Sequence, residues 1–216
     1  MKKITFKILS LLTVLLVCIT AIAASACKSS SSATTSVHTQ TWSAAPAMQI
    51  DLSKTYTAVF DTSLGTFKVQ LFTSLAPKTV NNFVFLSNQK FYDGTIFHRI
   101  MKTFMIQSGD PTGTGMGGPG YTIPDELPVK YSYDPGIVAM ANTGRANSGG
   151  SQFFICTGTV AANLNQNPIY TEFGKVIEGM DVVQKIAAVS VVASSSGELS
   201  KPVTPPVIKT ITIEVS

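Results

Sequence analysis

The stretch FHRIMKTFMIQSGD, residues 97–110, decides how the fold of this chain is interpreted. It places Arg99 among large apolar residues of the kind that fill the interior of a sheet, and Gln107 follows on a similar run. Arginine is rare in this sequence, because only Arg99 and Arg145 are found among the sixteen lysines and arginines. An ordinary surface position would have used lysine, so the stretch predicts a specific task for Arg99.

Short β-like runs flank this stretch on both sides, bounded by Gly, Pro, Asn and Ser. The expected strands cover residues 56–62, 66–72, 95–100, 104–108, 137–141, 152–157, 172–176 and 208–215. Two amphipathic helices are expected, over residues 76–88 and 178–186. Many short strands with only two helices predict a mostly β architecture that is closed or nearly closed.

The N-terminus has the pattern of an export signal. Three lysines precede an apolar run over residues 8–24, and small residues follow at Ser25 and Ala26. We therefore predict a signal peptide over residues 1–26 and exclude it from the fold. A retained membrane span remains the alternative, although the run is shorter than the roughly 20 residues that a bilayer requires.

Cys27 follows the predicted cleavage site directly, and the local sequence resembles a bacterial lipoprotein motif in which this cysteine is acylated. Ala24 stands where leucine is usual, so simple cleavage of the signal is a rival interpretation. Residues 27–49 are rich in Ser and Thr and nearly without periodicity, which predicts a flexible tether behind the lipid anchor. The folded domain is expected over residues 50–216.

Charge and cysteine content narrow the function further. The net charge of +4 falls to about +1 when the three lysines of the signal are removed, and no basic run remains. We therefore expect no nucleic-acid partner.

Cys156 is the only cysteine of the domain, so it cannot form an intradomain disulfide and should pack as a small apolar side chain.

The common catalytic patterns are largely missing from the sequence. His98 is the only histidine of the domain, and no Cys, His and carboxylate cluster has the spacing of a metal site, so we expect neither metal nor cofactor. A Ser, His and Asp triad is not excluded by counting, but no Gly-x-Ser-x-Gly motif is present. The glycine-rich run over residues 111–120 lacks the Gly-Lys-Ser/Thr ending of a phosphate-binding loop.

Five segments, taken in order and with their spacing, resemble the cyclophilins, which are peptidyl-prolyl cis-trans isomerases. These segments are FHRI at 97–100, FMIQSGD at 104–110, MAN at 140–142, GSQFFI at 150–155 and FGKV at 173–176. The resemblance covers essentially the whole domain. It implies a closed eight-stranded antiparallel β-barrel capped by two α-helices, with the active groove on the outside of the barrel.

The resemblance also implies roles for individual side chains. It implies catalytic roles for Arg99, Phe104 and Gln107. It implies that substrate is bound by Met105, Ala141, Asn142, Thr143, Gln152, Phe154, Leu164 and Tyr170. The resemblance places a pocket tryptophan that contacts cyclosporin at about Asn163 and a pocket histidine at about Tyr170. These departures leave tight cyclosporin binding open, whereas isomerase activity is expected to be retained.

These observations predict an exported bacterial isomerase, anchored through a lipid on Cys27 at the outer face of the cytoplasmic membrane or in the cell envelope. Its substrates would be proline-containing peptides and unfolded or exported proteins, and we expect a monomer. A proline-peptide-binding or chaperone module without turnover is the alternative. A solute-binding lipoprotein would need a cleft between two lobes, for which a single domain of this size leaves little room.

Overall fold

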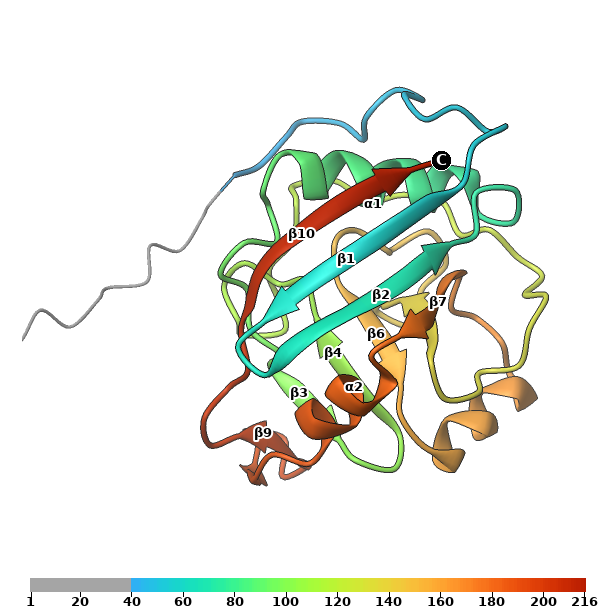
Figure 1. Cartoon of the computed structure of the whole chain (residues 1–216). Helices are drawn as coiled ribbons and strands as arrows, with labels where there is room; N and C mark the ends of the chain where they lie inside the picture. Colours follow the sequence, from blue (N-terminus) through green and yellow to red (C-terminus); the bar gives the residue numbers. More distant parts are fainter. Residues whose placement is uncertain (1–39) are drawn as a thin grey trace, which may run out of the picture. The chain divides into compact units, whose positions relative to one another are not determined.

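The structure, a computed structural model, describes residues 40–216 (Figure 1). The predicted signal peptide, Cys27 and most of the predicted tether lie outside the described residues. The helices are α1 (Pro77–Asn88), the 3-10 helix η1 (Thr159–Gln166) and α2 (Met180–Ala187). The strands are β1 (Tyr56–Thr62), β2 (Gly65–Leu71), β3 (Arg99–Met101), β4 (Met105–Ser108), β5 (Ile137–Met140), β6 (Phe153–Cys156), β7 (Glu172–Glu178), β8 (Val191–Ala193), β9 (Leu199–Pro202) and β10 (Ile208–Val215).

Eight of the strands form one curled antiparallel sheet in the order β10-β1-β2-β7-β5-β6-β4-β3. The expected mostly β architecture is confirmed, but the sheet is not a fully closed barrel, because its edge strands β3 and β10 are not paired along their length in the described chain. They are linked by a bridge between Ile96 and Val207 and by the bond from the Phe97 amide to the Pro206 carbonyl at 2.9 Å. The sheet is also accompanied by η1 and by the separate β8–β9 hairpin, neither of which was expected.

The main core lies inside the curl of the sheet. Side chains of β1 alternate between buried and half-buried positions, as period-two strand geometry requires. Phe60 of β1 stacks on Phe67 of β2 with ring centroids 4.5 Å apart, and Phe83 of α1 lies 5.7 Å from Phe153 of β6. Helices α1 and α2 lie at opposite ends of the sheet in Figure 1, so each end of this aromatic core is covered by a helix.

Strands β5 and β6 are buried on both faces, and β4 is buried except at Gln107. Ile106, Val138 and Ile155 belong to the main core, whereas the alternate positions belong to a second apolar cluster on the outside of the sheet. Its fully buried members are Met105, Tyr133, Ile137, Ala139, Phe154, Cys156 and Ala161. Cys156 is free and buried, as the sequence predicted, and burial raises its thiol pKa to about 12.

Two loops outside the sheet hold α1 in place. Its N-cap residue, Ala76, supplies no side-chain hydrogen bond, and Glu126 from a distant loop accepts bonds from the amides of Lys78 (3.0 Å) and Thr79 (2.8 Å) instead. Trp42 packs edge-on against Phe85 of α1 at 5.2 Å. Part of the segment that the sequence assigned to the tether therefore contacts the domain.

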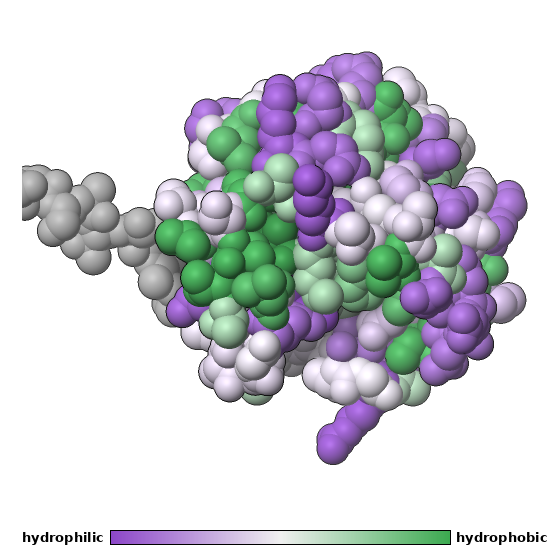
Figure 2. Space-filling view, turned by 90° about the horizontal axis from the view of Figure 1, so that it is seen from below, coloured by the Kyte–Doolittle hydropathy of each residue, from purple (hydrophilic) through white to green (hydrophobic). Residues whose placement is uncertain are grey.

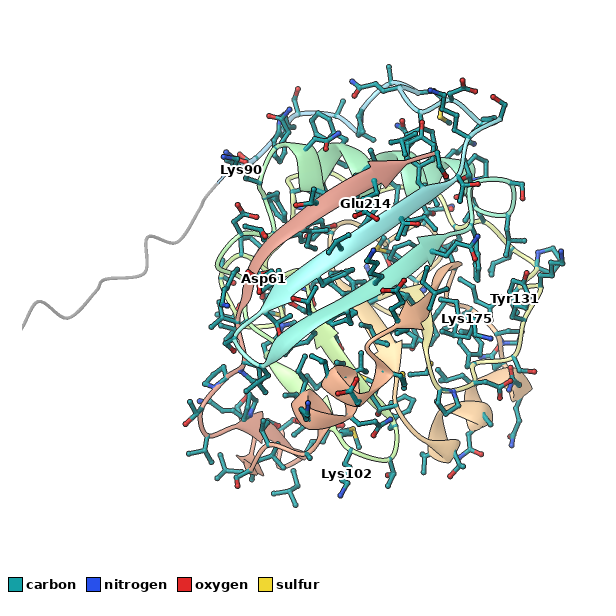
Figure 3. All side chains as sticks on the ribbon, in the orientation of Figure 1. Asp61, Lys90, Lys102, Tyr131, Lys175 and Glu214 are labelled. Atoms are coloured by element: carbon teal, nitrogen blue, oxygen red, sulfur yellow. The ribbon has the colours of Figure 1, made fainter. Side chains whose placement is uncertain are left out.

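The outer surface carries isolated ion pairs and a few apolar side chains. Asp61 pairs with Lys209 at 3.3 Å, and Glu214 with Lys68 at 3.5 Å; Figure 3 labels both acids on the outer face of β1 and β10. Exposed pairs of this kind contribute little to stability.

Figure 2 shows an apolar patch on the underside of the molecule. Within residues 40–216 no helix is both long and apolar enough to cross a membrane.

Candidate active site

Arg99 lies on the edge strand β3, directly opposite Gln107 of β4. Its side chain is 35% exposed, so it is neither a core residue nor freely mobile in solvent. The guanidinium carbon lies 5.9 Å from the centroid of the Phe104 ring, and Nη1 donates to Oε1 of Gln107 over a long 3.5 Å. The other side of the guanidinium is paired with Glu198 of the β8–β9 hairpin.

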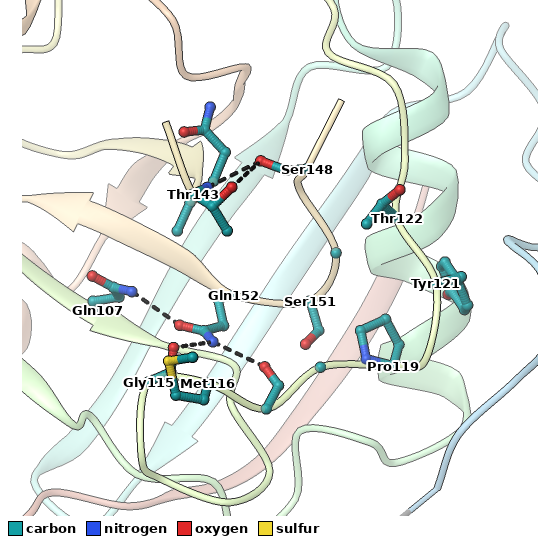
Figure 4. Close-up of a pocket in the computed structure, with 15 residues that line it drawn as sticks. Gln107, Gly115, Met116, Pro119, Tyr121, Thr122, Thr143, Ser148, Ser151 and Gln152 are labelled. Carbon is teal, nitrogen blue, oxygen red and sulfur yellow. Dashed lines mark hydrogen bonds between the residues drawn. The ribbon is translucent and has the colours of Figure 1, made fainter. Parts of the chain in front are cut away.

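Gln107 continues a chain of polar contacts away from Arg99 (Figure 4). Its Nε2 donates to Oε1 of Gln152 at 3.0 Å, and Nε2 of Gln152 donates to the carbonyls of Gly115 (3.0 Å) and Gly117 (2.9 Å). Each amide is satisfied by its neighbour, which fixes which end of each side chain is the donor. Arg99 is thereby connected through two glutamines to the glycine-rich loop.

The buried carboxylate of Asp110 organises that glycine-rich loop. It accepts hydrogen bonds from the amides of Thr112 at 2.7 Å and Gly115 at 2.6 Å. Burial by itself would raise the pKa of Asp110, but the bonds from Thr112, Gly117 and Gly115 outweigh it and hold the pKa below its ordinary value. Asp110 therefore remains ionised and keeps the loop amides turned inward.

The second apolar cluster forms the floor beside Arg99. The predicted site residues that belong to it or pack against it are Phe104, Met105, Ala141, Phe154, Leu164 and Tyr170. Phe154 meets Tyr170 edge-to-face at 5.3 Å, and Met105 is almost fully buried. An apolar floor beside a partly exposed guanidinium fits a ring-shaped apolar group with a polar atom next to it.

A groove of about 450 Å³ adjoins this floor, and its lining includes Gln107, Ala141, Asn142, Thr143 and Gln152. Nδ2 of Asn142 donates to the Ile169 carbonyl at 2.9 Å, which fixes this side chain. The Thr143 amide and hydroxyl both lie 3.0 Å from Oγ of Ser148 (Figure 4). The groove therefore adjoins the apolar floor at Ala141, which belongs to both.

The structure places the predicted site residues in two adjoining groups, the outer apolar cluster and the groove lining, which share Ala141. Arg99 contacts one member of each, Phe104 and Gln107. His98 is not among the residues lining the groove within the described chain, and burial lowers its pKa. Sequence reasoning missed Asp110 as the organiser of the loop and Glu198 as the partner of Arg99. The carboxylate at the end of FMIQSGD was a signal for the first, but nothing local marks Glu198.

The sequence and the fold match one family of proteins. A family model described as cyclophilin type peptidyl-prolyl cis-trans isomerase/CLD matches residues 57–213. The chain belongs to the cyclophilin-type peptidyl-prolyl cis-trans isomerases. This cyclophilin is similar to peptidyl-prolyl cis-trans isomerase A of Mycobacterium tuberculosis, with 42% identity over 175 residues that cover 74% of this chain and 92% of that protein.

Relatives from other organisms extend the similarity. Peptidyl-prolyl cis-trans isomerase-like 1 of Neurospora crassa is 45% identical over 133 residues, which cover 60% of this chain and 79% of the relative. A crystal structure of a cyclophilin type peptidyl-prolyl cis-trans isomerase from Cryptosporidium parvum matches with a TM-score of 0.65 and 36% identity, covering 74% of this chain and 98% of that one. A second structure of that protein, in the presence of the dipeptide Ala-Pro, matches with a TM-score of 0.64 and 37% identity, covering 73% and 98%.

Proposed function

We propose that this cyclophilin accelerates Xaa-Pro rotation in proteins that fold outside the cytoplasmic membrane, with Arg99 donating a hydrogen bond to the twisted imide. The observation that carries the proposal is the position of Arg99. Its guanidinium lies beside the ring of Phe104, and Nη1 contacts Oε1 of the groove residue Gln107 at 3.5 Å and Sδ of Met105 at 3.9 Å. Both contacts are weak enough to be exchanged for a bond to substrate.

The physics of the reaction favours such a donor. Rotation about a peptide bond faces a resonance barrier of about 18–20 kcal/mol. At the twisted geometry the imide nitrogen loses conjugation, so its lone pair becomes a better hydrogen-bond acceptor than in either planar state. A fixed guanidinium therefore binds the twisted state more tightly than the planar states, which lowers the barrier without proton transfer or a covalent intermediate.

The other groove residues are assigned supporting roles. The proline ring would lie on Phe104, Met105, Phe154 and Leu164, which belong to or pack against the outer apolar cluster. Gln107 would orient Arg99 or bond the substrate carbonyl, and Asn142 would hold the preceding peptide unit. The relative whose structure was determined in the presence of Ala-Pro supports a proline-containing ligand.

The setting outside the membrane rests on the N-terminal sequence. We propose that residues 1–26 direct export and that Cys27 carries a lipid, so that the domain stays close to the membrane face. Mass spectrometry of the protein recovered from its host cell tests this directly. A mature chain that begins with acylated Cys27 is the expected result, whereas a chain that keeps residues 1–26 contradicts the proposal.

The catalytic proposal is tested by NMR exchange spectroscopy of an Ala-Pro peptide with full-length protein in mild detergent. Arg99→Ala should reduce the cis-trans exchange rate by about a hundredfold or more. Arg145→Ala is the matched control, because Arg145 is the only other arginine and lies in an exposed loop; it should leave the rate unchanged. A wild-type protein that binds the peptide without accelerating exchange would establish the binding-module alternative instead.

A further inference from the structure

The β8–β9 hairpin presents a single carboxylate to the candidate active site. Strands β8 and β9 pair from Val191 with Pro202 to Ala193 with Leu199. At the turn, the Ser194 amide donates to the Glu198 carbonyl at 2.7 Å, and the Gly197 amide donates to the Ser194 carbonyl at 2.9 Å. The backbone of Glu198 is therefore fixed by the hairpin itself, and its side chain projects from an ordered position.

Glu198 binds Arg99 through two parallel hydrogen bonds. Nε donates to Oε2 and Nη2 donates to Oε1, each at 2.7 Å. This geometry fixes the plane of the guanidinium, because the group cannot rotate while both bonds to the same carboxylate are kept. The side chains of Arg99 and Glu198 are 35% and 32% exposed, so the pair lies at the rim of the site rather than in the core.

We propose that Glu198 is a positioning residue for Arg99, holding the Nε and Nη2 edge of the guanidinium so that Nη1 faces the groove. The inference rests on the proposed function, since it explains how Arg99 reaches the orientation that the reaction requires. Of the five N–H groups, two are used by Glu198 and one Nη2 hydrogen points toward Sδ of Met101 at 3.5 Å. Nη1 makes two long contacts, to Oε1 of Gln107 at 3.5 Å and to Sδ of Met105 at 3.9 Å, and both are weak enough to be exchanged for a bond to substrate.

The energetic reason for such a contact lies in preorganisation rather than in stability. A half-exposed ion pair contributes little to the free energy of folding. A long side chain that must be ordered at the transition state, however, loses rotamer freedom at that moment unless another group has already fixed it. Glu198 supplies that ordering in the free enzyme, where the guanidinium would otherwise sample solvent around the edge strand β3.

The pair is present over the whole pH range in which the enzyme would work. The hydrogen bond from Arg99 lowers the pKa of Glu198 to about 2, from an ordinary value of 4.5. Because the folded-state pKa is depressed, the carboxylate stays ionised above pH 4.5 and is neutralised only as the pH falls toward 2. Titration of Glu198 therefore does not regulate the enzyme near neutral pH.

The first test compares turnover of full-length wild type and Glu198→Gln on a proline-containing peptide. We expect kcat to fall about tenfold or more while KM changes by less than about twofold, because only the transition-state contact is misaligned. Glu214→Gln is the matched control: it removes another partly exposed carboxylate, the one that pairs with Lys68 on the outer face of the sheet, and should have no effect.

A double-mutant cycle separates positioning from a general structural role. In the Arg99→Ala background, Glu198→Gln should cause no further loss of kcat, because the residue through which it acts is missing. An equal loss in both backgrounds would overturn the proposal. So would an unchanged or increased kcat in the single variant, the increase meaning that Glu198 restrains Arg99 instead of orienting it.

The third readout is the pair of arginine Nε–Hε signals in a nitrogen-edited NMR spectrum. The chain has only two arginines, so the exposed Arg145 serves as an internal reference for Arg99. The Arg99 signal should be shifted and slow in solvent exchange in wild type and should move toward that of Arg145 in Glu198→Gln. If wild type shows no isomerase activity, both proposals fail; if it is active and Glu198→Gln matches it, only the positioning role fails.

Discussion

At the residue scale, the choice of arginine at position 99 has a physical reason. The guanidinium offers enough donors to bind Glu198 along one edge while Nη1 contacts Gln107. A lysine ammonium has three donors at one point and a mobile stem, so it cannot bind Glu198 and Gln107 at the same time with fixed geometry.

Arg99→Lys therefore tests geometry while keeping the charge. We expect kcat/KM to fall by about a hundredfold, the cost of removing one preorganised donor. The rate of cis-trans exchange in an Ala-Pro peptide is the measurement, with thermal unfolding as the control for folding. Activity within threefold of wild type would show that charge alone is sufficient.

At the element scale, the glycine-rich loop depends on one close approach. A Cβ at Gly117 would overlap the carboxylate of Asp110, which organises the loop. At the neighbouring Gly118, a Cβ would meet nothing within 4 Å. An alanine substitution at Gly117 therefore tests the steric requirement, and the same substitution at Gly118 is its control for a general effect of replacing a loop glycine.

We expect Gly117→Ala to lower the free energy of unfolding by about 1–3 kcal/mol and to reduce isomerase activity, because Gln152 loses the fixed carbonyl of Gly117. Gly118→Ala should remain within about 0.5 kcal/mol of wild type. Urea unfolding followed by circular dichroism gives both values. Equal stability of the two variants would show that the loop accommodates a methyl group at either position.

Helix α1 provides a second prediction at this scale. Its first amides are capped by Glu126, a residue 47 positions after Thr79 in the chain. Glu126→Gln should lower the free energy of unfolding by about 1 kcal/mol, since the positive end of the helix loses a carboxylate. Glu178→Gln, which alters an exposed carboxylate on β7, is the control. The idea fails if both variants unfold at the same urea concentration.

Local patterns were sufficient to predict most elements. The strand expected at 208–215 is confirmed as β10, and the helix expected at 76–88 is confirmed as α1 within one residue. The 3-10 helix η1, with the sequence TVAANLNQ, was missed because it is only eight residues long and buries only Ala161. The β8–β9 hairpin was missed because its strands have only three and four residues, and the buried positions of β9 are Ser200 and Pro202 rather than large apolar residues.

At the scale of the whole molecule, the segment before β1 contributes to the fold. Trp42 contacts the rings of Phe85 at 5.2 Å and Phe91 at 5.8 Å, and its amide donates to the Pro119 carbonyl at 2.9 Å. A tryptophan in a polar segment gave no sequence signal for this packing, because its partners lie more than forty positions later.

Trp42→Ala should lower the free energy of unfolding by about 2 kcal/mol, whereas Trp42→Phe should lose less than half as much. The midpoints of urea unfolding, measured by circular dichroism, test this. Because Trp42 is the only tryptophan, its fluorescence in wild type should change in the same transition. A separate, earlier fluorescence change would show that this segment detaches before the domain unfolds.

The sequence by itself determined the main strands, the two α-helices and the family, because periodicity is local and the family motifs keep their order along the chain. The roles of the groove residues stay predictions that the family motifs supply. Only the tertiary structure decided the curl of the sheet, the cap that Glu126 places on α1 and the pairing of Glu198 with Arg99. Arg99 and Glu198 are separated by 99 positions. No local preference predicts such contacts, because they exist only when folding brings segments that are distant in the sequence next to one another.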